Sequence, residues 1–255
     1  MTAPVFVLPP GEVAGAGVGS VVRVSGDEGR HAVTVRRIAT GEQVSLVDGA
    51  GRRLRGRVSA VIGKHSFDVD VAEVVDEPEP GLRVTVVQAL AKGDRGELAV
   101  GQLTEIGVDE IVPWSAAHSV VHWRGDRAEK SANRWSDAIT ASAKQSRRGR
   151  FPVLAPLATT ADIVTRMGVA SAAVVLHESA TEPISAVVPP ERGELLIVVG
   201  PEGGISPDEL LAFTDAGARV ARLGPTVLRT SSAGLAAVAV LLSATTRWSI
   251  DAVEG

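Results

Sequence analysis

The chain has 255 residues, of which 45% are hydrophobic, so it can form two ordinary domains or one large one, and extended disorder is excluded. It contains no cysteine, which excludes a disulfide scaffold, a thiolate metal site and a cysteine nucleophile. The N-terminus lacks the basic start and apolar centre of a signal peptide, and no apolar run is long enough to span a bilayer. We therefore expect a cytoplasmic protein without a membrane partner.

The net charge is −4, but the charge is unevenly distributed along the chain. Residues 1–64 carry 9 Lys and Arg against 5 Asp and Glu, whereas residues 65–82 carry six acids and no Lys or Arg. Residues 83–150 are again basic, with 11 against 8. Basic charge concentrated in the first 150 residues indicates a surface that binds a polyanion. Ordinary solvated charge is the alternative interpretation.

The first 75 residues show the alternation of short β-strands separated by turn residues. We predict a small β-barrel-like domain over residues 1–75, with one short helix over Glu28–Arg37 and a hairpin turn at "VDGAGRR". The predicted strands are 20–26, 42–49, 52–61 and 66–75. A linker rich in proline and acids follows at residues 76–82.

From residue 83 to residue 255 the pattern changes to strands that alternate with helices. This predicts a second domain with an α/β fold and a mostly parallel sheet, whose ligands bind at the carboxyl ends of the strands. The predicted strands are 83–90, 110–114, 172–178, 195–200 and 218–224. The predicted helices are Arg95–Ile106, Asp126–Arg147, Ala161–Met167, Pro207–Ala216 and Ser231–Trp248.

The segment "ELLIVVGPEGGISPDEL" joins an apolar strand to a helix through a glycine-rich turn. Its glycines allow a ligand to approach the backbone closely. Ser206 is a good N-cap and forms a capping box with Glu209, while Pro207 suits the first helical position. Acids in the first helical turn disfavour phosphate, and the turn matches neither the dinucleotide nor the nucleoside-triphosphate fingerprint. A purely structural turn is the alternative for this segment alone.

Two further strand ends extend the pattern. "RVARLGPTVLRTSSAGLAAVAVLL" again runs from a strand through a Gly224-Pro225 turn to a helix, which Thr230, Ser231 or Ser232 opens. This helix is rich in Ala and Gly, so a neighbour can pack closely against it. A third strand ends in His177-Glu178, where His177 is either a site residue or an ordinary loop histidine. The three strand ends together predict one pocket.

These turns resemble the knotted SPOUT class of S-adenosylmethionine-dependent RNA methyltransferases. Among them, the chain is most similar to RsmE-type enzymes, which methylate N3 of a uridine in small-subunit (16S) ribosomal RNA. "RHAVTVRRIATGEQVSLVDGAG" resembles that family's N-terminal PUA-like RNA-binding domain, and the stretches at 89–121 and 141–152 resemble its central segment. The resemblance covers nearly the whole chain, and the two C-terminal turns together are its specific part.

The resemblance implies a C-terminal trefoil knot, a homodimer and a bent S-adenosylmethionine held largely by backbone groups, with no metal. The 16S ribosomal RNA, within the small subunit, is the expected partner. The resemblance places these residues around the cofactor: Leu176, His177, Glu178, Gly200, Pro201, Glu202, Gly203, Leu223, Gly224, Pro225, Leu228, Arg229 and Thr230.

The sequence departs from the family pattern at two places. Where relatives read L-R-T-E-T-A, this chain has "LRTSSAG", so Ser231 replaces an acid, and "QLTEIG" replaces K-A-T-E-L-G. Uridine N3 must lose a proton when it is methylated, so a base or a stabilising cation is needed. We expect Arg229 to stabilise the uracil anion, or alternatively to pair with a carboxylate of the second subunit. Glu202 is a candidate base, or alternatively a residue that holds the turn.

Candidate RNA-binding residues lie in three basic clusters that can neutralise phosphates. The strand around Arg55 would place alternate arginines on one face as a basic stripe, although charges that protect a hydrated edge strand would show the same pattern. The four tryptophans can stack on bases, but core packing is the preferred interpretation for most of them. The candidates are His31, Arg36, Arg37, Arg53, Arg55, Arg57, Lys144, Arg147 and Arg148.

Two other functions are compatible with parts of this pattern. A non-catalytic RNA-binding or ribosome-assembly protein would keep the fold and lose the chemistry, as the replacement of an acid by Ser231 suggests. A nicotinamide-dependent oxidoreductase is disfavoured because the dinucleotide fingerprint is absent.

Overall fold

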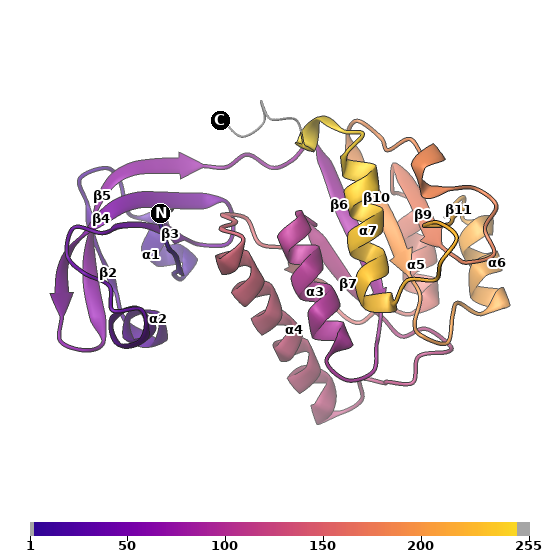
Figure 1. The fold of residues 1–255 in the computed structure, drawn as a ribbon, viewed down its shortest axis with the longest axis horizontal. Coiled ribbons are helices and arrows are strands. Elements are labelled where there is room, and N and C mark those ends of the chain that lie inside the picture. The colour runs from indigo at the N-terminus through magenta and orange to yellow at the C-terminus, as the bar shows by residue number, and fades with distance from the viewer. Residues whose placement is uncertain (1–2, 249–255) are drawn as a thin grey trace. The chain divides into compact units, whose positions relative to one another are not determined.

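The computed structural model describes residues 3–248, and the chain divides into two compact units. The first unit combines Met1–Glu79 with Ala143–Phe151, and the second combines Pro80–Ser142 with Pro152–Gly255. Helix α4 (Asp126–Gln145) leads from the second unit back into the first. Figure 1 shows both units and labels most of their helices and strands.

The first unit contains one five-stranded sheet in the order β1-β3-β4-β5-β2. All neighbouring strands are antiparallel except β1 and β3, which are parallel. A phenylalanine from β1 and one from β5 meet edge to face in its core, with ring centroids 5.1 Å apart. The strands are β1 (Val5–Val7), β2 (Val21–Val24), β3 (Gln43–Val47), β4 (Arg52–Ile62) and β5 (Ser66–Asp76).

The four predicted strands of the first unit are confirmed, and two short elements add to them. Strand β1 and helix α1 (Pro10–Ala14) were not predicted. The predicted helix Glu28–Arg37 is helix α2 (Gly26–Arg30) followed by the π-helical turn η1 (His31–Val35). Residues on β4 alternate between buried and exposed, and bulges after Arg55 and Val58 bend this strand and its partner β5.

The second unit contains a six-stranded sheet in the order β11-β9-β10-β6-β7-β8, and every pair is parallel. The prediction of an α/β fold with a mostly parallel sheet is therefore confirmed. The central strands β6 and β10 are mostly apolar and buried because helices cover both of their faces. The strands are β6 (Leu82–Ala89), β7 (Glu110–Trp114), β8 (Val153–Leu154), β9 (Ala172–Leu176), β10 (Gly193–Val199) and β11 (Arg219–Ala221).

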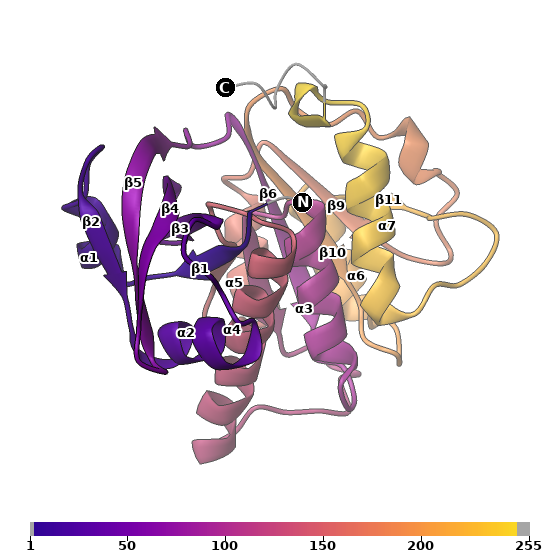
Figure 2. The same cartoon turned by 60° about the vertical axis from the view of Figure 1, so that its left-hand side comes forward.

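Helices α3 (Arg95–Ile106) and α7 (Thr230–Leu242) lie side by side over β6 and β10, as both ribbon views show (Figures 1 and 2). Helices α5 (Thr160–Met167) and α6 (Pro207–Asp215) pack into a second apolar core of the sheet, which also contains Leu196 and Val198 of β10. The short 3₁₀ turn η2 (Ile184–Ala186) follows β9. None of the helices in the described part of the chain has the length and apolar character needed to cross a membrane.

The predicted helix Ser231–Trp248 was wrong at its C-terminal end. Helix α7 stops at Leu242, and a separate 3₁₀ turn, η3 (Thr246–Trp248), follows it. The hydroxyls of Ser243 and Thr245 donate to the last carbonyls of the helix, at 2.7 Å each. Such side-chain hydrogen bonds compete with continued helix, and they end it here.

Candidate functional site

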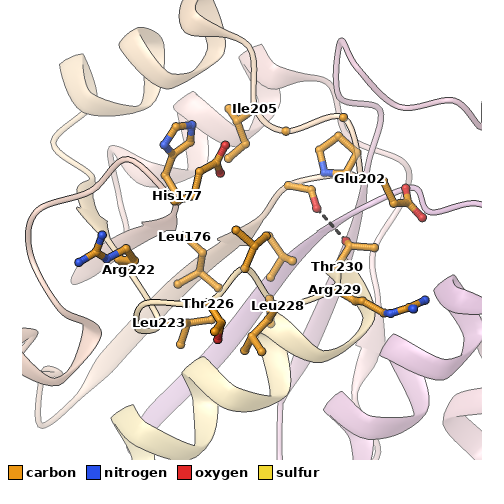
Figure 3. A pocket seen from close by; sticks show the side chains of 18 of the residues that line it. Leu176, His177, Glu202, Ile205, Arg222, Leu223, Thr226, Leu228, Arg229 and Thr230 are labelled. Carbon is orange, nitrogen blue, oxygen red and sulfur yellow. Dashed lines mark hydrogen bonds between the residues drawn. The ribbon is translucent and has the colours of Figure 1, made fainter.

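The carboxyl ends of β9, β10 and β11 open into one pocket of about 480 Å³ (Figure 3). All thirteen residues that the resemblance placed around a cofactor line this pocket. The pocket thus joins three segments that are far apart in the sequence, as expected for a ligand site of a parallel sheet. Its lining consists of Arg95, residues 176–178, residues 199–205, residues 222–230 and Ala233.

The glycine-rich turn after β10 needs its glycines for steric reasons. A Cβ on Gly203 would lie 2.9 Å from the Cβ of His118 and 3.0 Å from the carbonyl oxygen of the same residue. A Cβ on Gly200 would lie 2.8 Å from Ile205 Cγ1, and Gly204 has a positive φ of 77°. Any larger residue at the first two positions would displace the pocket wall, because contacts this short are repulsive.

The predicted capping box at the start of α6 is confirmed: the Ser206 side chain accepts from the Glu209 amide, and the Glu209 carboxylate accepts from the Ser206 amide. Glu209 also has a second task, which the sequence did not reveal. Its Oε1 accepts hydrogen bonds from the amide of Ala117, at 2.8 Å, and from the hydroxyl of Thr160, at 3.1 Å. This buried carboxylate therefore ties the glycine turn to the segment after β7 and to α5.

The second loop, residues 222–230, is fastened to the glycine turn by a hydroxyl. Thr230 is the first residue of α7, and its Oγ1 donates to the carbonyl oxygen of Gly200 at 2.7 Å (Figure 3). The helix start predicted at this place is confirmed, although its N-cap, Arg229, makes no side-chain capping bond. The hydroxyl that the sequence suggested as a cap instead joins two walls of the pocket.

The charged groups at the pocket differ in their partners. The Glu202 carboxylate accepts from the amide of Lys92 and from the guanidinium of Arg95, both at 3.2 Å. Burial acts to raise the pKa of this carboxyl, but the amide groups of Glu202 and Lys92 and the cation of Arg95 outweigh it, so the pKa lies below its ordinary value. Arg229 is exposed, and its side chain has no hydrogen bond or ion pair with the residues that the structure describes.

His177 occupies the end of β9 and is half-buried. Its Nδ1 lies 3.2 Å from the amide nitrogen of Ser179, which can only donate, so Nδ1 is the acceptor and the neutral ring carries its hydrogen on Nε2. The same Nδ1 lies 2.8 Å from the Ser179 hydroxyl. The ring is held by its own turn.

Most of the candidate RNA-binding residues of the first unit have intramolecular partners. The arginines of β4 face acids of β5 and the residue that follows it, with Arg53–Glu77 at 2.7 Å and Arg55–Glu73 at 3.2 Å. The remaining partners of this group are the Gly41 carbonyl for Arg57, the Glu28 carboxylate for Lys144 and the Arg150 carbonyl for Arg148. The stripe of arginines is therefore interleaved with acids.

Arg36, Arg37 and Arg147 differ from this group. All three side chains are exposed and form no ion pair or hydrogen bond within residues 3–248. Arg37 and Arg147 have φ values of 58° and 60°, and these are the two non-glycine residues with positive φ in the described chain. His31 is also exposed and lies at the start of η1, close in sequence to Arg36. The free arginines among these candidates thus lie at helix ends and not on the strand.

The tryptophans mostly pack inside the second unit. Trp114 is fully buried against Phe213, and Trp135 is 4% exposed and meets Trp123 edge to face. Trp248 is 44% exposed. Core packing, the preferred interpretation for most of them, is confirmed for Trp114 and Trp135.

Two family models match this chain: the RNA methyltransferase domain over residues 77–242, and the RNA methyltransferase PUA domain over residues 24–72. The chain is 45% identical to ribosomal RNA small subunit methyltransferase E of Mycobacterium tuberculosis over 240 residues, which is 92% of this chain and 91% of the relative. It is 30% identical to the protein of that name from Bacillus subtilis, over 86% of this chain and 88% of the relative.

The chain is also similar to a solved structure of a protein with that name. The structure of ribosomal RNA small subunit methyltransferase E from Neisseria gonorrhoeae, bound to S-adenosyl methionine, matches with a TM-score of 0.82 at 26% identity. The match covers 95% of this chain and 98% of the Neisseria chain.

Proposed function

The chain belongs to the ribosomal RNA small subunit methyltransferase E family, and we propose that it transfers a methyl group from S-adenosylmethionine to N3 of a uridine in 16S ribosomal RNA. The observation that carries this proposal is the convergence of three strand ends on one pocket. The similarity to a Neisseria protein solved with S-adenosyl methionine supports the choice of cofactor.

The residues of the pocket fit this cofactor. Leucines at positions 176, 223 and 228 offer apolar contact for an adenosine, and the glycines of both loops leave backbone groups accessible. A volume of about 480 Å³ suits a nucleoside-sized ligand. The carboxylate of Glu178 can contact the positive sulfonium, whereas the carboxylate of Glu202 is already paired with Arg95. When bound, the cofactor supplies an electrophilic methyl group.

In the proposed reaction, the carbon–sulfur bond breaks as the N3–carbon bond forms, and sulfur keeps the electron pair. The proton of N3 leaves to solvent, and the negative charge that develops on the uracil needs a nearby cation. Arg229 has that role in our proposal, because it lines the pocket and its exposed guanidinium has no hydrogen bond or ion pair with the described residues, so that it is free to contact the base of a bound RNA (Figure 3). Glu202 is a poor base because its pKa is lowered, and its contacts to Lys92 and Arg95 suit a residue that holds the loop.

RNA binding is proposed for the first unit, with its free cations as the main contacts. Arg36, Arg37 and Arg147 can bind phosphates without first breaking an ion pair, whereas Arg53 and Arg55 would have to leave their carboxylates. We also propose a homodimer. Val227 and Leu228 of the pocket loop are 80% and 38% exposed, and a second copy of the chain would cover such apolar side chains.

The test uses radiolabelled S-adenosylmethionine and small ribosomal subunits from a strain that lacks this protein. Label recovered in 3-methyluridine after digestion is the expected result, and Arg229→Ala should lower kcat with little change in cofactor affinity. Arg222→Ala is the matched control, since Arg222 also lines the pocket and lies on the opposite side of it from Arg229 in Figure 3.

Cofactor binding without any label in RNA would instead support the non-catalytic RNA-binding protein. A titration in which NAD binds and S-adenosylmethionine does not would support the oxidoreductase.

A further inference from the structure

Gln88 is a buried polar residue in the central strand β6. It lies near the end of β6, between Val199 of β10 and Pro113 of β7, and none of its surface is exposed. Its Nε2 donates to the Thr230 hydroxyl at 3.0 Å and lies 3.3 Å from the Ala89 carbonyl oxygen. Its Oε1 is buried with no hydrogen-bond partner among the described residues. A buried amide that is only half satisfied destabilises a fold, so its presence calls for a role beyond packing.

The Thr230 hydroxyl is the centre of a chain of two hydrogen bonds. A hydroxyl has one hydrogen to donate, and the amide of Gln88 can only donate to it through Nε2. The Thr230 hydrogen is therefore directed to its other neighbour, the carbonyl oxygen of Gly200, at 2.7 Å. Gln88, Thr230 and Gly200 thus form a bridge, named here the Gln88 bridge, from β6 through α7 to the turn after β10.

Close helix packing brings the bridge within reach. Gly234 lies one helical turn after Thr230, and a Cβ there would lie 3.0 Å from Leu103 and 3.4 Å from Val199. The glycine therefore lets the first turns of α7 sit directly on β6 and β10. The Thr230 hydroxyl, on the same helix face, can then contact a side chain of the sheet.

The pocket has two walls, residues 200–205 and residues 222–230. Given methyl transfer in this pocket, we propose that Gln88 is a positioning residue for the reaction. Through its hydrogen bond to Thr230, Gln88 sets the spacing between the two walls. Gln88 is not part of the pocket lining and acts on it only through the Thr230 hydroxyl. Both walls contribute residues to the proposed cofactor site, so an error in their spacing misplaces the methyl donor. Small misplacements of this kind lower the rate of a positioned reaction strongly.

The test compares wild type with Gln88→Met, Thr230→Val, Thr230→Ser and the double variant Gln88→Met/Thr230→Val. Hydrogen exchange of the amides of 200–205 and 228–233 is measured in the cofactor-free protein, and affinity for S-adenosylmethionine is measured by titration. We expect Thr230→Val to weaken binding about tenfold, as for the loss of one buried hydrogen bond, and to speed exchange in both segments. Thr230→Ser keeps the hydroxyl and should resemble wild type.

Gln88→Met removes the donor and the unpaired oxygen together, so it should speed exchange and weaken binding while leaving the Tm near that of wild type. The double variant should bind no more weakly than Thr230→Val, because Gln88 acts only through Thr230. Thr104→Val is the control: this threonine is fully buried, and its hydroxyl donates to Val100 of its own helix at 2.8 Å. It should lower the Tm without changing exchange in the two segments.

Two results would overturn the proposal: wild-type exchange and affinity in Gln88→Met, or additive losses in the double variant. A wild-type protein that does not bind S-adenosylmethionine would instead refute the proposed function. The exchange data of the cofactor-free variants would still decide whether the Gln88 bridge holds the walls.

Discussion

Replacing Glu209 by alanine should destabilise the second unit far more than the loss of an ordinary helix cap. The carboxylate is 7% exposed and accepts from the amides of Ser206 and Ala117 and from the hydroxyls of Ser206 and Thr160. The hydroxyls can rotate to other acceptors, but the two amides cannot. At about 1–3 kcal/mol for each buried donor left unpaired, the loss for the two amides is about 2–6 kcal/mol. At roughly 2–4 °C for each kcal/mol in a protein of this size, the Tm should fall by roughly 4–24 °C.

The assay is thermal unfolding of Glu209→Ala beside Asp162→Ala. Asp162 closes an equivalent capping box with Thr159 on α5. Its side chain is exposed, and among the described residues it accepts no hydrogen bond from outside this box, whereas Glu209 accepts one from the amide of Ala117. We expect Asp162→Ala to lower the Tm clearly less, and to leave cofactor affinity unchanged. Glu209→Ala should also weaken cofactor binding, since the glycine turn loses its tie to the segment after β7. Equal changes in Tm for the two variants would refute this reasoning.

Three further predictions follow from the site. Gly203→Ala should weaken cofactor binding and cost about 1–3 kcal/mol of stability by overpacking, as measured by titration and thermal unfolding. Gly168→Ala is the control, because its Cβ would meet only an ordinary contact at 3.4 Å, and it should change neither quantity. The double variant Arg37→Ala/Arg147→Ala should reduce the slope of log affinity for RNA against log salt by about 1 to 2, while Arg55→Ala, which is paired with Glu73, should leave the slope unchanged. Because the pKa of Glu202 is lowered, its stabilising contacts are present above the ordinary glutamate pKa of 4.5 and are lost only as pH falls below that value. The difference in cofactor affinity between wild type and Glu202→Gln should therefore be constant from about pH 6 to 8. A difference in affinity that changes in this range would contradict the role given to Glu202.

Features with a local sequence signal could be predicted. The capping box of Ser206 and Glu209 has a fixed spacing of three residues, and β10 contains a continuous apolar run, so both were found, whereas the two-residue strand β8 gives no such run and was missed. The short strand Val5–Val7 lies in an apolar run of only four residues between two prolines, and it was missed. The end of α7 was placed too late because an apolar pattern does not show that the hydroxyls of Ser243 and Thr245 donate hydrogen bonds to backbone carbonyls.

Contacts over long sequence distances could not be predicted from spacing. Glu209 reaches Ala117 across 92 positions, and nothing near either residue indicates the other. Gln88 did leave a signal, since a glutamine within "RVTVVQAL" must find a partner if the strand is buried. The sequence could indicate that a partner exists, but only the packing of α7 on the sheet identifies it as Thr230.

The ion pairs of the β4 arginines also depend on residues that are distant in the sequence. Alternation placed Arg53, Arg55 and Arg57 on one face, and the structure has them there. The acids of residues 65–82 were visible in the sequence, but only the register of β4 with β5 shows that Glu73 stands opposite Arg55. Charge counts therefore overstated the free positive charge of this strand.

The most direct test of the central claim is hydrogen exchange of the whole protein with and without saturating S-adenosylmethionine. If the cofactor binds where three strand ends meet, protection should appear in peptides that cover residues 176–178, 199–205 and 222–230, and peptides of the first unit should not change. Binding that leaves these three segments unprotected would contradict the assignment of the pocket, and with it the mechanism built on Arg229.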